Sequence, residues 1–187
     1  PDFVANCATF SEKGDGLLHS ALFRGKLTYV PESKSWYCWE DHHWRSTHIH
    51  MVEASVEQVG NKYREVAAHY ENWPRMPVRV VTWLNSSRGV NACVKFTLAN
   101  SDPLISKPDV WDTDPWLLGV ANGVVDLRTG EHRPGRPEDY ILRYCPVEWK
   151  GLHEPAPLWE ETLQQIIGAS EGVLPWLHKV LGYAITG

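Results

Sequence analysis

The stretch LLGVANGVVDLRTGEHRPGR, residues 117–136, carries the clearest indication of the fold in this chain of 187 residues. Apolar runs flank Asn122-Gly123 on both sides. This dipeptide favours a two-residue hairpin loop, because both loop positions need positive φ. A second turn is predicted at residues 128–130, where Gly130 can adopt positive φ at little cost. The stretch therefore predicts antiparallel strands joined by tight turns.

Residues 25–47 indicate more β structure. They contain three short runs of aromatic and β-branched residues separated by turn residues, which is typical of a three-stranded meander. Because side chains alternate along a strand, Trp36 and Cys38 should share one face and Tyr37 and Trp39 the other.

Apolar spacings of three and four residues predict helices elsewhere in the chain. The first spans residues 48–70. The segment 73–77 stops the helical pattern, because its two prolines cannot donate a hydrogen bond inside a helix. The apolar face of the helix over 48–70 holds Val52, Val56, Val59, Tyr63 and Val66. Other helices are predicted over residues 78–84, 87–99, 157–167 and about 171–185. The last helix should pack on the one before it, with Leu174, Leu177, Val180 and Leu181 against Trp159, Leu163 and Ile167. The helix over 87–99 should have Ser86 or Ser87 as its N-cap and Asn100 at its end.

Helices and hairpins fall in separate blocks, which favours an α+β fold over a doubly wound sheet. We expect a small antiparallel β-meander and β-hairpins packed with a helical bundle. Residues 1–20 are rich in glycine and serine with little periodicity, so we expect an irregular segment there with a short helix or a loop at most, followed by one domain over residues 21–187. The chain starts at Pro1 and ends in an apolar run, so we expect it to be part of a longer polypeptide.

The net charge of −5 provides no overall positive field, so any contact with nucleic acid must be local. The four cysteines are far apart and form no C-x-x-C pair, which fits a reducing compartment. We find no signal-peptide layout and no apolar run of the roughly 20 residues that a membrane span needs. We therefore expect a cytoplasmic protein without a membrane partner.

Motifs for catalysis or metal binding are weak. No G-x-x-x-x-G-K-[ST] phosphate loop is present, since Leu27 follows Gly25-Lys26, and we expect no catalytic residue and no cofactor in this chain. We also expect no metal, because paired ligand spacing is missing from the one cluster with enough ligands for zinc: Cys38, Asp41, His42, His43, His48 and His50. Turns and caps explain three aspartates better than acid–base chemistry does: Asp112, Asp114 and Asp126.

Two basic groups are candidates for nucleic-acid binding. Residues 72–101 contain no acid and four cations, Arg75, Arg79, Arg88 and Lys95. Arg88 and Lys95 are two helical turns apart and could meet successive phosphates, although a solvated helix face explains the same pattern. The second group includes Arg133 and Arg136, with Arg128 and Arg143, and it is diluted by neighbouring acids.

The segment DPWLLGVANGVVDLRTGEHRPGRPEDYI, followed by PLWEETLQQII and LPWLHKVLGYAITG, resembles the N-terminal helicase-associated domain of phage and plasmid primase-helicases of the poxvirus type. The run LTYVPESKSWYCWEDHHW is similar to the opening of the same domain. The resemblance extends from about residue 20 to the end. Asn122 to Gly130 is its most specific part.

The resemblance implies an accessory domain between a primase region and a superfamily III helicase of the AAA+ type. The whole polypeptide would bind ATP and Mg²⁺, form a ring oligomer and unwind DNA at the replication origin of a mobile element in a bacterial cytoplasm. Its DNA partner would be single-stranded or forked. This domain would position the motor, couple it to the primase, and guide DNA.

Two other classes of function remain open. The chain could be a stand-alone single-stranded DNA-binding module, with Arg79, Arg88 and Lys95 on phosphates and Trp36, Trp39 or Trp44 stacking on bases. It could also be a metal-dependent enzyme that uses the histidine cluster. Salt-dependent DNA binding would support the former and metal analysis the latter.

Overall fold

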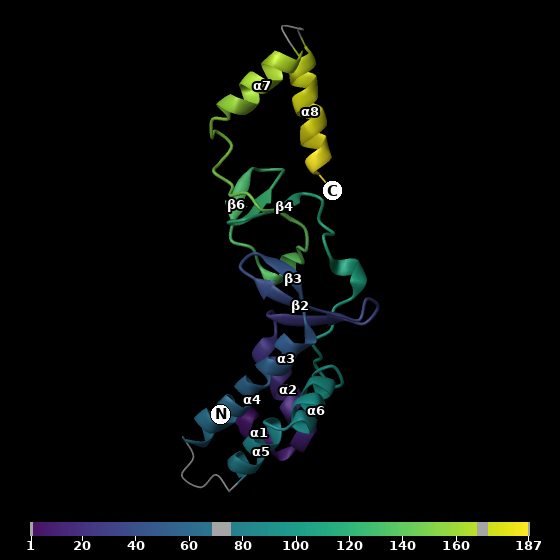
Figure 1. Cartoon of the computed structure of the whole chain (residues 1–187), viewed down its shortest axis with the longest axis vertical. Helices are drawn as coiled ribbons and strands as arrows, with labels where there is room; N and C mark the ends of the chain where they lie inside the picture. Colours follow the sequence, from purple (N-terminus) through teal and green to yellow (C-terminus); the bar gives the residue numbers. More distant parts are fainter. Residues whose placement is uncertain (1, 69–75, 168–171, 187) are drawn as a thin grey trace. The chain divides into compact units, whose positions relative to one another are not determined.

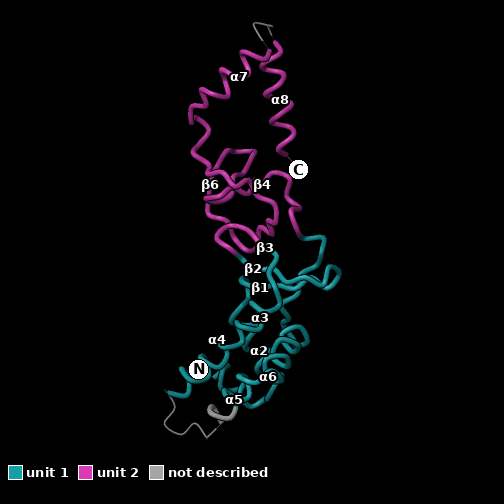
Figure 2. The backbone as a smooth tube through the Cα atoms, viewed as in Figure 1, with its two compact units in different colours: residues 1–39, 45–110 teal, residues 40–44, 111–187 magenta. Residues whose placement is uncertain are grey.

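The computed structural model describes residues 2–68, 76–167 and 172–186, and it divides the chain into two compact units (Figure 2). Unit 1 comprises residues 1–39 and 45–110, and unit 2 comprises residues 40–44 and 111–187. Helices and small sheets together make an α+β protein, which confirms the predicted fold class.

Unit 1 combines a helical core with a small sheet (Figure 1). Helix α2 lies against α6 and α1, and α4 lies against α5 and α1. Its elements are α1 (Asp2–Thr9), α2 (Ser11–Phe23), β1 (Leu27–Val30), β2 (Ser35–Glu40), β3 (His43–Thr47), α3 (Ile49–Ser55), α4 (Glu57–Ala67), α5 (Met76–Leu84), α6 (Ser87–Thr97) and the 3₁₀ turn η1 (Pro108–Val110). Residues 40–44, which are the end of β2, the turn and the start of β3, group with unit 2.

The prediction of an irregular segment over residues 1–20 is wrong, because α1 and most of α2 lie within these residues. Gly14 and Gly16 both lie inside α2. A Cβ on Gly14 would overlap the carbonyl group of Cys7, and a Cβ on Gly16 would overlap the backbone of Phe96. These glycines therefore allow α2 to approach α1 and α6 closely, and they do not mark a loop.

The predicted apolar face of residues 48–70 is confirmed, since Val52, Val56, Val59, Tyr63 and Val66 are all buried. The helix nevertheless divides into α3 and α4. Ser55 lies at the division, where its hydroxyl oxygen is 2.6 Å from the carbonyl oxygen of Val52. Serine bonds of this kind to the preceding turn often bend helices.

The predicted meander is confirmed as a sheet in the order β1-β2-β3. Strand β1 pairs antiparallel with β2, with Leu27 opposite Cys38. Trp36 and Cys38 share a face, as expected, and both pack in an apolar cluster with Phe23 and Leu27.

Unit 2 contains a mixed sheet in the order β6-β5-β4-β7. Three of its strands come from the stretch over 117–136, and the fourth, β7, pairs parallel with β4 and had no signal in the sequence. The elements are β4 (Leu117–Val120), β5 (Gly123–Asp126), β6 (Glu131–Arg133), the 3₁₀ turn η2 (Pro137–Asp139), β7 (Tyr144–Cys145), α7 (Pro157–Ile167) and α8 (Val173–Ile185).

The hairpin between β4 and β5 has a two-residue loop, as predicted, but one residue earlier than expected. Val120 pairs with Gly123, so the loop residues are Ala121 and Asn122. Asn122 has negative φ and uses its side chain instead: its amide nitrogen donates to the Trp149 carbonyl at 3.0 Å, and its amide oxygen accepts from the Trp149 N–H at 2.9 Å. Gly123 has φ of +154° and is the first residue of β5.

Helix α7 has the predicted bounds, and α8 begins two residues later than the predicted 171. The two helices contact each other. Among the described helices, none combines the length and apolar character required to cross a membrane.

Candidate functional site

Helix α6 carries the first candidate surface. Its N-cap is Ser86, as predicted, whose hydroxyl accepts from the Gly89 N–H at 3.1 Å and donates to the Trp83 carbonyl at 2.7 Å. At the other end the Asn100 amide donates to the carbonyls of Phe96 and Thr97. Both ends of the helix are therefore fixed by side chains of the chain itself.

The solvent face of α6 carries Arg88, Asn91 and Lys95, all exposed and spaced three and four residues apart. We call these three residues the α6 stripe. Neither cation of the stripe has an ion-pair partner within the described parts of the chain, and residues 76–101 contain no acid. The stripe can therefore offer two positive charges and one amide to an anionic strand.

Two other predicted cations cannot be placed against this stripe. Arg75 lies outside the described residues. Arg79 belongs to α5, but its side chain also lies outside the described part. Their role in nucleic-acid binding stays a prediction.

The second predicted basic group lies in unit 2, and two of its four arginines form ion pairs: Arg128 with Asp126 and Arg133 with Asp139. The Arg133 guanidinium donates two hydrogen bonds, of 2.8 and 2.7 Å, to the Asp139 carboxylate, and this contact raises the pKa of Arg133. Burial opposes ionisation of Asp139, but hydrogen bonds from Arg133 and from the Arg136 N–H outweigh it and hold the pKa of Asp139 below its usual range. Arg133 therefore fixes the turn at η2, while the Arg136 side chain is exposed.

Two of the three tryptophans considered for base stacking are buried. Trp36 is 5% exposed and Trp44 is 4% exposed. The Trp44 indole N–H donates to the Pro137 carbonyl at 2.9 Å, and its ring meets Trp111 edge-on at 5.8 Å. Both rings serve their own units, so neither can stack on a base in this conformation. Trp39 is half-buried.

The side chains of His42, His43 and His50 have different partners in the structure. His42 Nδ1 accepts from the Gly135 N–H at 3.2 Å, the His43 ring stacks on Tyr144 at 3.9 Å, and His50 contacts Glu53 at 3.1 Å. Within residues 2–68, 76–167 and 172–186, no three histidine, cysteine or acidic side chains are grouped as metal ligands. The metal-enzyme hypothesis therefore gains no support from the described residues.

Helices α7 and α8 carry a third surface, which is apolar. Val173, Trp176, Val180 and Tyr183 repeat at spacings of three and four along α8, and all four are exposed. We call these four residues the α8 stripe. Leu174 and Leu177, on another side of α8, are half-buried, and Leu163 is the one buried residue of α7 among those described. The predicted packing of the two helices is thus only partial, because Trp159 and Leu181 remain substantially exposed.

The family described as D5 N terminal like matches residues 17–168. The chain belongs to this family. The match confirms the resemblance to an N-terminal helicase-associated domain, and the α6 stripe lies inside the matched D5 N terminal like region while α8 lies beyond it.

A relative in Frog virus 3 (isolate Goorha) is named "Putative helicase 022R". It is 51% identical over 41 residues, which are 22% of this chain and 4% of the relative. The matched segment is therefore a small part of a much longer protein. Together, the D5 N terminal like match and this relative support a helicase-associated domain.

Sequence reasoning missed the exposure of the α8 stripe. It identified α8 as apolar but placed its side chains against α7. The signal was present, since α8 has apolar residues on more than one side, and a single neighbouring helix cannot cover all of them.

Proposed function

We propose that this chain is an accessory domain of an ATP-driven DNA helicase, and that α7 and α8 dock against an adjoining helicase domain of the same polypeptide. The observation that carries the proposal is the α8 stripe. Trp176 is 61% exposed and Tyr183 is 83% exposed. Large aromatic side chains stabilise a protein core or an interface most when they are buried.

A helix that is apolar on several sides belongs in the interior of a larger assembly. Here Leu174 and Leu177 are half-buried on one side of α8, and the α8 stripe is exposed on another. A contiguous exposed apolar surface of this kind marks a contact with another protein surface. Docking at α8 would fix the position of the motor relative to this domain and transmit its movements.

In this proposal ATP and Mg²⁺ bind to the adjoining helicase domain. In this chain Gly25-Lys26 lies between α2 and β1, ahead of a strand, whereas a phosphate-binding loop leads into a helix. The primase region, the ring oligomer, the phage or plasmid origin and the bacterial cytoplasm are parts of the same proposal, which the resemblance supports.

The docking proposal is tested with the double variant Trp176→Glu/Tyr183→Glu in the whole polypeptide. Two carboxylates in an apolar contact cannot be desolvated without penalty, so ATP-driven strand separation should fall by at least about tenfold, a loss of about 1.4 kcal/mol of coupling. ATP hydrolysis without DNA should stay near the wild-type rate. The matched control is Val147→Glu, also on an exposed apolar side chain of unit 2. Wild-type unwinding by the double variant would contradict docking at α8.

A second function, guiding DNA, is favoured by the α6 stripe. We propose that Arg88 and Lys95 contact two phosphates of a single strand, with Asn91 between them. Each phosphate contact releases about one counterion, so affinity should fall as salt rises. This surface would bring the strand to the motor and would need no sequence preference.

The test measures binding of a fluorescent oligonucleotide to the chain at several salt concentrations. The variant Arg88→Ala/Lys95→Ala should flatten the salt dependence by about one to two units of log–log slope. The variant Lys13→Ala/Lys107→Ala changes the net charge equally at exposed sites elsewhere in unit 1 and should keep the wild-type slope. Equal slopes for all three proteins would contradict DNA binding at the α6 stripe and would mean that it is only a solvated helix face.

A further inference from the structure

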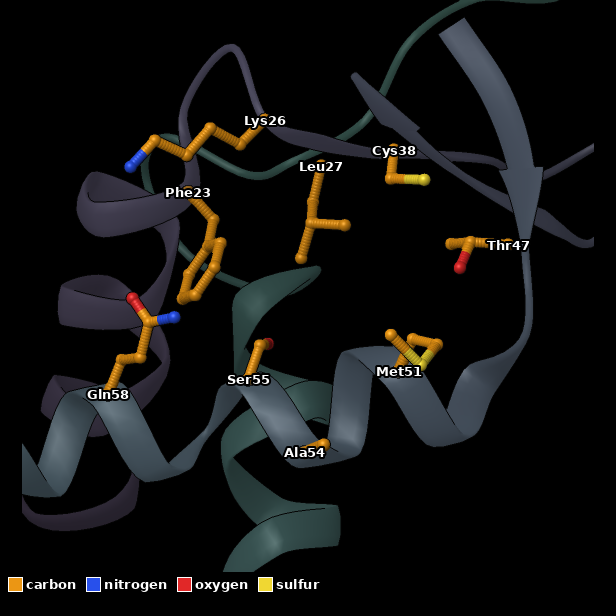
Figure 3. A pocket seen from close by; sticks show the side chains of 9 residues that line it. All are labelled: Phe23, Lys26, Leu27, Cys38, Thr47, Met51, Ala54, Ser55 and Gln58. Atoms are coloured by element: carbon orange, nitrogen blue, oxygen red, sulfur yellow. The ribbon is translucent and has the colours of Figure 1, made fainter. Parts of the chain in front are cut away.

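Unit 1 contains an open pocket of about 380 Å³ between its small sheet and helices α3 and α4 (Figure 3). This volume is within the range of about 300–1,000 Å³ that is usual for small-ligand sites. Phe23 and Leu27 form a buried apolar floor, and Met51 adds a flexible thioether at the mouth. The nine described residues that line the pocket include no carboxylate.

A chain of hydrogen bonds beneath the floor of the pocket links Ser55, His19 and Thr97. The Ser55 hydroxyl lies 2.7 Å from His19 Nε2, and His19 Nδ1 lies 3.0 Å from the Thr97 hydroxyl. The His19 ring also packs on Phe23, with ring centres 4.6 Å apart. Because these contacts join α2, α3 and α6, the pocket is largely formed before any ligand enters.

Three polar side chains on the lining have unused hydrogen-bonding capacity. The Lys26 ammonium, the Gln58 amide and the Thr47 hydroxyl each lack a hydrogen-bond or ion-pair partner among the residues that the structure describes. In Figure 3, Lys26 and Gln58 lie at one end of the lining, and Thr47 lies at the other beside Met51. Phe23 lies beside Lys26 and Gln58, and Leu27 lies between that end and Thr47 (Figure 3).

We infer that this pocket binds a nucleotide, with the base over the apolar floor and the phosphate at Lys26. A base presents an apolar face and a polar edge, which match the floor and the Thr47 hydroxyl. The phosphate takes the Lys26 ammonium, and Gln58 can hydrogen-bond to the sugar or to the phosphate. An apolar peptide side chain would fill the same floor but would leave all three polar groups without partners.

The nucleotide can come from two sources: a free mononucleotide, or a terminal nucleotide of a single DNA strand. Both present the same base and phosphate. This inference does not depend on docking at α8 or on phosphate contacts at α6, since the pocket uses neither surface.

The test titrates the isotope-labelled chain with adenosine 5′-monophosphate and follows backbone amide resonances by NMR. Shifts should saturate below about 1 mM, as a ligand of this size can reach, and should be largest at residues 23–27 and 54–58. Adenosine should bind about fivefold to tenfold more weakly, because it lacks the charge-assisted contact. Ribose 5-phosphate should bind more weakly than the nucleotide because it lacks the base.

Variants separate a site from general attraction. Lys26→Ala should lower the affinity for the nucleotide to that of adenosine, whereas Lys107→Ala, an equal charge change at an exposed site of the same unit, should leave it unchanged. Ala54→Phe fills the mouth from an exposed position and should abolish binding, with an unchanged unfolding temperature as proof of folding.

Oligonucleotides with and without a 5′-phosphate distinguish the sources. Displacement of the mononucleotide by the phosphorylated strand alone assigns the pocket to a strand end, and no displacement by either assigns it to a free nucleotide. Either outcome supports the site. Shifts that do not saturate by about 5 mM, or an equal loss in Lys26→Ala and Lys107→Ala, would overturn it.

Discussion

Replacing Gly123 by alanine should destabilise unit 2 by about 3 kcal/mol. Gly123 begins β5 with φ of +154°, a conformation that L residues rarely adopt. A Cβ at this position would also lie well inside van der Waals contact of the Arg133 carbonyl oxygen and of His132 Nε2. Two separate penalties therefore act on the same residue.

The magnitude follows from those two contributions. Holding a residue other than glycine at such a φ costs about 1–3 kcal/mol. The overlap with Arg133 involves backbone, which side-chain rotation cannot relieve, and overpacking of this kind costs about 1–3 kcal/mol more. Partial relaxation of the strand should leave a total of about 3 kcal/mol.

Two matched glycines of unit 2 isolate the contributions. Gly151 has φ of +110° with no atom within 4 Å of a Cβ, so Gly151→Ala should show the φ penalty alone. Gly182 lies in α8, also in open space, so Gly182→Ala should leave stability unchanged or raise it by about 0.5–1 kcal/mol.

Native-state hydrogen exchange at the amides of Val124 and Val125, which are buried in β5, measures the opening free energy of this sheet. Gly182→Ala should be the most stable of the three variants, Gly151→Ala should be less stable, and Gly123→Ala should be the least stable. If the last two variants agree within about 0.5 kcal/mol, there is no overlap with β6, and the reasoning about the β5–β6 register is refuted.

Two further predictions concern hydrogen bonds and pH. Asn122→Ala removes both bonds to the Trp149 backbone and should cost about 1–3 kcal/mol, measured by urea denaturation, and a loss below about 0.5 kcal/mol would mean that water replaces the side chain. Burial raises the pKa of Asp15 from 3.8 to about 6, partly offset by the hydrogen bond from Tyr63, and burial lowers the pKa of His19 from 6.5 to about 4. On acidification the folded state therefore gains stability from Asp15 and loses it through His19, by about 3 kcal/mol each, so wild-type stability should change little between pH 6.5 and 4. Asp15→Asn should lose stability as the pH falls through this window and His19→Gln should gain it, as measured by urea denaturation followed by far-ultraviolet circular dichroism. Parallel profiles for both variants would contradict this assignment.

Periodicity and turn chemistry predicted much of this fold. The meander, the bounds of α7 and the Ser86 cap were all found from local patterns, because each depends on residues close together in the sequence. The same is true of the apolar face of α3 and α4, where the spacing of the apolar residues determines which side is buried.

The features that were missed depend on contacts between distant residues. Gly14 and Gly16 resemble loop residues until their approach to α1 and α6 is known. Asn122 resembles a positive-φ turn residue, but its amide is bound to Trp149, 27 residues away. Strand β7 has two residues, too few for any periodicity.

The candidate surfaces show the same division. Arg88 and Lys95 were found by their spacing on one helix, and the pairing of Arg133 with Asp139 required the geometry of the turn at η2. The pocket beside α3 draws its lining from two helices, a helix end and three strands. No local pattern could have assembled it.

Hydroxyl-radical footprinting of Trp176 and Tyr183 tests the central claim, docking at α8, most directly. The oxidation rate of each side chain is compared between residues 1–187 and the whole polypeptide with ATP bound, using exposed Tyr144 of the same unit as the internal reference. The account predicts that oxidation of both α8 residues falls by at least about fivefold in the whole polypeptide, relative to Tyr144. Equal oxidation rates in the two proteins would contradict docking at α8.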